Sequence, residues 1–269
     1  MKRALLIGIN YNGSAYQLSG CINDMETVKF YLLQRGYPPE NIKLLTDETA
    51  VKPTRKNVLD AIAWLVNNLQ PGDTTCFYYS GHGARVLDIS GDEQSGLDNV
   101  LVPIDADTSG VITDDEFRKK LVNCIPVGAN LWAFFDCCHS GTMLDLRYNF
   151  VPDVKLLKQG GALPSTYAPS DWADTYRLKI QADTSSFGSV VMFSGCLDPQ
   201  TSADAPIKGK AQGAFTYCLM ECLNKKKPLG ARLRDVLKEV NGLLTINGFA
   251  QRSQLSIGYI EDFNKPLNI

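Results

Sequence analysis

Residues 133–142, Ala-Phe-Phe-Asp-Cys-Cys-His-Ser-Gly-Thr, contain the side chains most able to do chemistry. Cys137 and Cys138 are adjacent, with Asp136 before them and His139 after them. Consecutive side chains of an extended chain point in opposite directions, whereas structural zinc sites space paired ligands by about two to four residues. The chain has two histidines and no Cys-x-x-Cys pair, which argues against a zinc site and against a thioredoxin-like redox pair. An inert packed thiol and a nucleophilic thiol remain.

A nucleophilic cysteine needs a base nearby, because an ordinary thiol has a pKa of about 8.5 and only the thiolate attacks. His139 directly follows the two thiols in the chain and is badly placed to face them. The other histidine, His82, lies in Tyr-Tyr-Ser-Gly-His-Gly-Ala, residues 78–84, just after an apolar run. Gly83 would let the backbone approach a substrate and direct an N–H at an oxyanion. A histidine in a glycine-rich turn is often structural. His82 and the two cysteines, however, each come just after an apolar run that indicates a buried strand, and this equivalent placement favours a catalytic role.

The elements that must position these loops alternate along the chain. Strands are predicted over residues 4–10, 41–46, 74–80, 99–104, 130–136, 189–195 and 254–258. Helices are predicted over residues 22–33, 58–69, 113–123, 213–224 and 230–245, with a Thr113/Glu116 capping box in the third. Apolar strands followed by helices indicate an α/β fold with a mostly parallel sheet covered on both faces. Active groups of such sheets gather at the carboxyl ends of the strands. Residues 147–188 are rich in Gly, Pro, Ser and Thr and are expected to be irregular.

Composition narrows the classes of partner. The 269 residues carry a formal net charge of -2, which offers no field for nucleic acid or an anionic membrane. Apolar runs are too short to span a bilayer, and the apolar start of the chain ends at Asn10, so it indicates a buried strand rather than a secretion signal. The eight cysteines lie partly within apolar patterns, which predicts buried thiols in a reducing, cytoplasmic setting.

Together, Tyr-Ser-Gly-His-Gly and Asp-Cys-Cys-His-Ser-Gly resemble the metacaspases, cysteine peptidases of the caspase-like (caspase–hemoglobinase) fold. The likeness extends to residues 18–25, 98–105, 193–204 and 213–219, and so to nearly the whole chain. It implies that Cys138 is the nucleophile, that His82 is its partner, and that backbone N–H groups of Gly83 and Cys138 hold the oxyanion. Cys137 then occupies the family's variable position.

The resemblance also implies a single caspase-like domain over residues 1–269. Its large part would cover about residues 1–150, its linker about 147–188 and its small part about 189–269. Many type I relatives carry an N-terminal extension that this sequence lacks, so we expect a catalytic core without that region. Metacaspases are mostly monomers, and no organic cofactor is expected.

Metacaspases cut after Arg or Lys, and the resemblance assigns the specificity pocket to Asp24 and Asp136, helped by Cys21 and Ser80. A carboxylate pair in a partly dry cleft would select a cation, and its geometry would favour Arg. The alternative for Asp24 is a solvated acid in the first turn of a helix, where it suits the dipole. Asp136 could instead cap the backbone after its strand.

Calcium activation is a further implication of the resemblance, through Asp98, Asp114, Asp115 and Asp145. Residues 105–116 also satisfy the EF-hand loop pattern, with Gly110 and Glu116 in the required positions. An EF-hand needs an entering helix, and residues 99–104 are strand-like, so we interpret this match as accidental. The alternative for the four aspartates is that Asp114 and Asp115 only serve the N-terminus of their helix.

Self-cleavage between the large and small parts is a hypothesis that rests on basic residues. The candidates are Arg147, Lys155, Lys158, Arg177, Lys179, Lys208 and Lys210.

The expected function is a calcium-activated cysteine endopeptidase acting on peptides or proteins with Arg or Lys before the cut. Two alternatives stay open, namely a legumain-like or separase-like peptidase of the same fold and a non-proteolytic scaffold.

Overall fold

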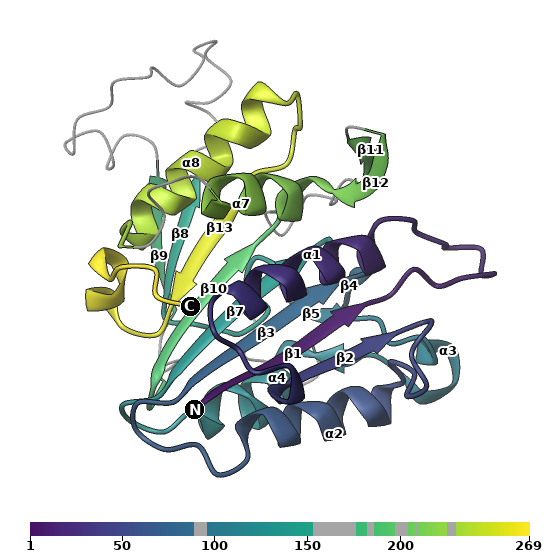
Figure 1. Ribbon diagram of the computed structural model, residues 1–269, viewed down its shortest axis with the longest axis horizontal. Coiled ribbons are helices and arrows are strands. Elements are labelled where there is room, and N and C mark those ends of the chain that lie inside the picture. Colours follow the sequence, from purple (N-terminus) through teal and green to yellow (C-terminus); the bar gives the residue numbers. More distant parts are fainter. Residues whose placement is uncertain (89–95, 153–175, 182–185, 197–203, 208, 225–229) are drawn as a thin grey trace.

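An eight-stranded sheet organises the computed structural model, which describes all residues except 89–95, 153–175, 182–185, 197–203, 208 and 225–229 (Figure 1). Its strands lie in the order β2 (Ile42–Thr46), β1 (Lys2–Gly8), β3 (Thr74–Ser80), β7 (Asn130–Asp136), β10 (Ser189–Ser194), β13 (Gln254–Ile257), β8 (Tyr148–Pro152) and β9 (Tyr176–Ile180). The pairings from β2 to β10 are parallel, and those from β10 to β9 are antiparallel. The predicted α/β fold with a mostly parallel sheet is confirmed.

Alternating side chains of the central strands build two cores, one on each face of the sheet. In β3, Tyr78 belongs to the core under α1 (Cys21–Gln34), α7 (Ala214–Asn224) and α8 (Leu233–Ile246). Tyr79, one residue later, belongs to the core under α2 (Arg55–Val66) and α4 (Asp114–Lys120). Figure 1 shows these two sets of helices on opposite faces of the sheet. The period-two pattern of a strand buried on both faces explains the continuous apolar runs in the sequence.

Two smaller sheets lie outside the central one. An antiparallel sheet contains β4 (Gly83–Leu87), β5 (Leu97–Leu101) and β6 (Ile112–Thr113), and a hairpin joins β11 (Asp204–Ile207) to β12 (Lys210–Gly213). The short helices are α3 (Ala106–Ser109) and the 3-10 helices Pro39–Asn41, Val122–Cys124 and Ile260–Asn264. The strand predicted over 99–104 exists as β5, but its place in the parallel sheet was wrong, because β4 and β6 pair with its two edges.

The expectation of an irregular segment over 147–188 is wrong at β8 and β9, which extend the central sheet. The apolar pattern of β8 is short, and its pairing partner β13 is distant in sequence, so no local signal marks it. The helix predicted to reach Leu69 ends at Val66, because Asn67 is extended, with a ψ of 127°, and Asn68 follows with a φ of 55°. At α4 the Thr113 half of the predicted capping box is confirmed, since Thr113 Oγ1 accepts from Glu116 N at 3.3 Å, whereas the Glu116 carboxylate binds Arg55.

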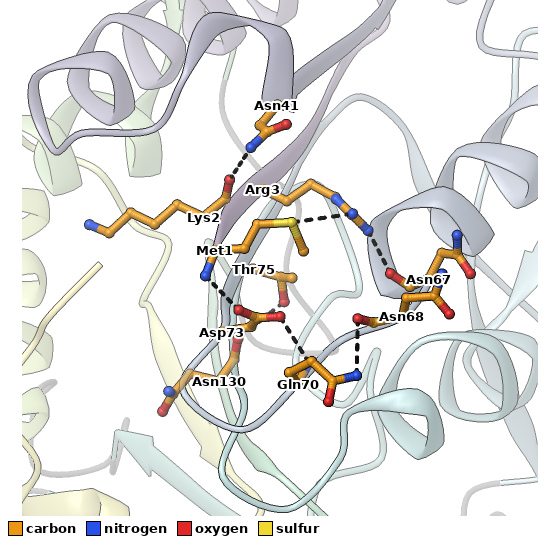
Figure 2. Close-up of polar contacts among 10 residues, drawn as sticks. All are labelled: Met1, Lys2, Arg3, Asn41, Asn67, Asn68, Gln70, Asp73, Thr75 and Asn130. Atoms are coloured by element: carbon orange, nitrogen blue, oxygen red, sulfur yellow. Dashed lines mark hydrogen bonds and ion pairs between the residues drawn. The ribbon is translucent and has the colours of Figure 1, made fainter.

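Contacts at the amino ends of the strands hold β1 and β3 in register (Figure 2). The Met1 amino group donates to the Asp73 carboxylate, which also accepts from Gln70 N at 2.8 Å. These hydrogen bonds, the one from the amino group first, lower the pKa of Asp73. Register is kept to the other end of the sheet, where Ser80 of β3 pairs with Asp136 of β7.

Candidate active site

Strands β3 and β7 end side by side and place the two candidate catalytic loops next to each other. His82 and Cys138 each follow the Ser80–Asp136 pair by two residues. The backbones of the loops touch, because a Cβ at Gly83 would stand 2.1 Å from the Cys138 carbonyl oxygen. Glycine is required for that approach. The side chains of His82 and Cys138 are both half-buried, so a substrate can reach this edge of the sheet.

The two adjacent thiols have different surroundings. Cys137 is fully buried in the core under α2 and α4, and burial raises the pKa of its thiol well above the usual value. Its carbonyl oxygen accepts from Ser140 Oγ and from Cys196 Sγ, both at 2.9 Å. Cys138 keeps part of its surface in solvent. His139 adopts a φ of 54°, a left-handed conformation of the kind found where an active site over-determines the backbone.

Two tyrosines and a backbone carbonyl orient His82. Its Nε2 lies 2.6 Å from the Tyr16 carbonyl oxygen, which can only accept, so Nε2 carries a proton. The Tyr11 ring lies 4.6 Å from the imidazole, centroid to centroid, and the Tyr11 hydroxyl accepts from His82 N at 3.0 Å. Tyr79 Oη donates to the His82 carbonyl oxygen at 2.8 Å. These contacts leave Nδ1 as the nitrogen that can exchange a proton with a thiol. No sequence motif indicated Tyr11 or Tyr16 as partners of His82.

The four predicted specificity residues lie at the same carboxyl edge of the sheet, on the face that α1 covers. Asp24 and Cys21 come from the first turns of α1, Ser80 ends β3 and Asp136 ends β7, and all four are buried. Ser80 Oγ donates to Asp24 Oδ2 at 3.3 Å. The alternative of a solvated Asp24 is excluded by its exposure of 1%.

Gly213 and Thr216 hold the two carboxylates in place; they lie in the segment 213–219 that resembles metacaspases, but the sequence analysis assigned them no role. Gly213 N donates to Asp24 Oδ2 at 2.8 Å, and Thr216 donates to Asp136 Oδ2 from its N at 2.9 Å and its Oγ1 at 2.7 Å. A Cβ at Gly213 would stand 2.2 Å from Asp136 Oδ2 and 2.8 Å from Asp24 Oδ2. Burial, followed by the charges of these two aspartates, raises the pKa of Tyr78 well above its usual value. The donors named here are neutral backbone and hydroxyl groups.

The proposed calcium ligands lie on segments that meet beside α4. Asp98, Asp114 and Asp145 are buried and Asp115 is half-buried. Asn99 N donates to Asp114 Oδ2 at 2.9 Å, and Arg118 Nη1 donates to the Asp145 carbonyl oxygen at 2.6 Å. Carboxylate oxygens suit calcium, but within the described ranges no three His, Cys, Asp or Glu side chains are spaced to hold a metal ion.

The EF-hand geometry is absent at residues 105–116. Strand β5 precedes this stretch where an EF-hand has its entering helix. Arg55 Nη2 contacts both carboxylate oxygens of Glu116, at 2.7 and 2.6 Å, and Arg55 N donates to Asp105 Oδ1 at 2.7 Å. Asp105 and Glu116, the first and last positions of the EF-hand pattern, therefore bind Arg55 at the start of α2. This agrees with the interpretation that the match to the EF-hand pattern is accidental.

Four of the self-cleavage candidates can be placed. Arg147, Arg177, Lys179 and Lys210 are exposed. Arg177 and Lys179 lie in β9 and Lys210 lies in β12, so a peptidase would reach these bonds only after the strand is released. Lys155, Lys158 and Lys208 lie outside the described residues.

Comparisons with known proteins agree with this architecture. A family model described as metacaspase, peptidase C14 domain matches residues 2–147. Metacaspase-1A of Aspergillus terreus is 37% identical, over 98% of this chain and 72% of its own length. Metacaspase-1 of Mycosarcoma maydis is 36% identical over the same shares. The solved structure of protein GSU0716 from Geobacter sulfurreducens, at 24% identity, has a TM-score of 0.66 over 98% of this chain and 97% of that one, which supports the fold alone.

A mostly parallel sheet with a thiol and an imidazole at its carboxyl edge defines a caspase-fold cysteine peptidase. The chain belongs to the metacaspase family and is a cysteine-type endopeptidase. This confirms the resemblance that the sequence motifs indicated. Among the helices that the structure describes, none has the length and apolar character needed to cross a membrane.

Proposed function

We propose that this metacaspase cuts peptide bonds after Arg or Lys, with Cys138 as nucleophile and His82 as its acid–base partner, and that calcium activates it. The observation that supports the specificity is the buried carboxylate pair of Asp24 and Asp136 beside the nucleophile's loop. Two neighbouring carboxylates attract a cationic side chain, and the five N–H donors of a guanidinium suit carboxylate oxygens. Ser80 and Cys21 would line the same subsite.

The catalytic cycle follows from the orientation of His82. The Cys138 thiol gives its proton to Nδ1, while Nε2–H stays bonded to the Tyr16 carbonyl. The thiolate attacks the carbonyl carbon, and the N–H groups of Gly83 and Cys138 stabilise the oxyanion. His82 then protonates the leaving amine, the C–N bond breaks and a thioester forms. Water hydrolyses that thioester and regenerates the thiol.

Calcium dependence is the part of the proposal that rests on Asp98, Asp114, Asp115 and Asp145. Burial lowers the pKa of Arg118, and the neighbouring Asp145 and Asp115 carboxylates oppose that shift, so a guanidinium already shares this acidic region. A bound hard dication would draw the carboxylates together and supply charge that Arg118 supplies only in part. No catalytic step is assigned to the ion.

A peptide panel tests the specificity. Peptides that differ only in having Arg, Lys, Asp or Asn before a reporter amide are assayed with and without calcium. We expect Arg and Lys substrates to be cleaved with calcium, and Asp substrates to have a kcat/KM at least about a hundredfold lower, because a carboxylate meets like charge. Cys138→Ala should abolish turnover, whereas Cys124→Ala, which removes an exposed thiol, should not. Cleavage after Asn would support a legumain-like enzyme, and no turnover would support a scaffold.

A second pair of variants tests the calcium ligands. Asp98→Asn should remove both the calcium stimulation of hydrolysis and the rise in melting temperature on adding calcium. Asp105→Asn should retain both, since Asp105 serves the start of α2. The opposite pattern would restore the EF-hand interpretation.

Mass spectrometry after calcium treatment tests self-cleavage in the same samples, and an intact chain in an active enzyme would contradict it.

A reducing, cytoplasmic environment is also part of the proposed function. None of the eight cysteines, all of which lie in the described part, forms a disulfide. That supports the reducing, cytoplasmic environment expected from the sequence.

A further inference from the structure

A cavity of about 510 Å³ lies against His82 and Gly83 and is not used by the specificity pair. Its volume falls in the range of about 300–1,000 Å³ that is typical of ligand sites. Loop residues after β1, the start of β4 and the segment after β5 enclose it. The lining is mainly apolar and includes Tyr11, Ala84, Val102, Pro103, Ile104 and Ala106.

The cavity and the acidic pair lie on opposite faces of the sheet. Asp136 contacts Thr216, which bonds to Tyr78 in the core under α1 and α7. Tyr11, which lines the cavity, belongs to the core under α2 and α4. His82 lies against the Tyr11 ring and borders the cavity. A peptide extending from the acidic pair across the sheet edge would therefore pass His82 and then reach the cavity.

The direction of the reaction decides which part of the peptide lies there. His82 must protonate the leaving amine, so the part of the substrate after the scissile bond lies on the His82 side of Cys138. The residue before the bond is held on the other side, by Asp24 and Asp136. The cavity is thus next to the residue that directly follows the cut.

Hydrogen bonding within the cavity wall favours an apolar occupant. The Tyr11 hydroxyl donates to the Val102 carbonyl oxygen at 2.6 Å, accepts from His82 N, and lies 3.1 Å from Tyr79 Oη. These polar groups are already paired, so an apolar side chain leaves none of them unsatisfied. Ile104 is 38% exposed and would lose contact with water on binding. Among the lining residues of the described chain, Asp107 alone carries a carboxylate.

We propose that this cavity is the subsite for an apolar side chain, such as Leu or Phe, of the residue immediately after the scissile bond. The inference rests on the proposed cleavage after Arg or Lys. It makes the segment Val102–Ala106 a determinant of specificity that acts on the leaving half of the substrate.

Internally quenched peptides test the subsite. They share one sequence through Arg and carry Leu, Phe, Gly, Lys or Asp directly after it. We expect kcat/KM for Leu and Phe to exceed that for Gly by at least about tenfold, as for other apolar pockets. Ile104→Asp should bring the Leu-to-Gly ratio near one and raise kcat/KM for Lys relative to Leu. The matched control is Ile246→Asp, at a side chain that is 82% exposed on α8, and it should keep the parental ratio.

The outcomes separate this inference from the proposed function. Cleavage of an Arg reporter amide, which has no residue after the cut, tests the proposed function alone. If that amide is cleaved and the parent enzyme shows equal kcat/KM for Leu and Gly, the subsite is overturned and the function stands. An unchanged ratio in Ile104→Asp also overturns it. In the Cys138→Ala protein, fluorescence anisotropy should show tighter binding of the uncut Leu peptide than of the Gly peptide, and equal binding would contradict the proposal.

Discussion

Cys137 and Cys138 are chemically identical neighbours that the fold places in opposite environments. Strand β7 ends at Asp136, and the next side chain continues the inward alternation into the core under α2 and α4. Burial there disfavours a thiolate at Cys137. Cys138 emerges at the rim, beside the loop of His82. A shift of one residue therefore separates a buried thiol from one that is partly exposed, as the proposed nucleophile must be, and this depends on where the strand ends.

Differential alkylation tests this contrast at the residue scale. With limiting iodoacetamide at neutral pH, Cys138 of the folded protein should react at least about tenfold faster than Cys137, because reactivity follows exposure and thiolate content. Cys124, an exposed thiol, serves as the benchmark, and Cys76, which is fully buried, should resist like Cys137. Fragment-ion mass spectrometry distinguishes the adjacent sites, and unfolded protein should label all of them alike. Equal labelling of Cys137 and Cys138 in the native state would contradict the assignment.

At the residue scale, the motifs in the sequence predicted which side chains the fold brings to one edge of the sheet, and their roles stay predictions. The motifs around His82 and Cys138 fall at the ends of β3 and β7, and Asp24 and Asp136 converge. The family likeness includes residues 213–219, but the sequence could not reveal the contact of Gly213, whose N–H donates to Asp24 across 189 residues of chain. Its role comes from the close approach of three separate segments, which leaves no local pattern.

At the scale of elements, buried strands and amphipathic helices were predictable, and exposed or short strands were not. The runs at 74–80 and 130–136 coincide with β3 and β7, because strands buried on both faces are apolar throughout. Strands β4, β9 and β12 have few buried side chains, so their sequences carry no period-two contrast. Such strands form because a partner supplies the hydrogen bonds, and that partner is visible only in the fold.

The junction of β12 with α7 gives a prediction at this scale. Gly213→Ala should lower the free energy of unfolding by about 1–3 kcal/mol, the usual cost of overpacking. It should also lower kcat/KM on Arg peptides by at least about tenfold, because the added methyl group would push the Asp24 and Asp136 carboxylates apart. Urea unfolding and steady-state kinetics measure the two effects.

Gly242→Ala is the matched control for that substitution. Gly242 lies inside α8, and a Cβ there would meet no atom within 4 Å. The change should raise the free energy of unfolding by about 0.5–1 kcal/mol, through the higher helix propensity of alanine, and leave hydrolysis as it was. If both variants had equal activity, the role of Gly213 in spacing the carboxylates would be refuted.

At the scale of the whole molecule, the position of the last strand bears on self-association. Strand β13 lies between β10 and β8, so both of its edges are occupied. Caspases dimerise through a final strand, and here that route is closed by β8 and β9. Among the described strands, the outer one on this side of the sheet is β9, where Arg177 and Lys179 are exposed. Charged side chains on an edge strand oppose pairing with a second copy.

We therefore predict a monomer, with a mass near 29.6 kDa by sedimentation equilibrium at micromolar concentrations. Replacing both edge charges, Arg177→Thr with Lys179→Thr, should promote concentration-dependent association, because the β9 edge would lose its electrostatic protection and gain β propensity. The control, Lys52→Thr with Lys56→Thr, removes the same charge from two exposed positions, one just before α2 and one in its first turn, and should stay monomeric. A parent protein that dimerises in this range would show that another surface, not the final strand, mediates assembly. Association of both double variants alike would mean that net charge, rather than the edge of the sheet, keeps the molecules apart.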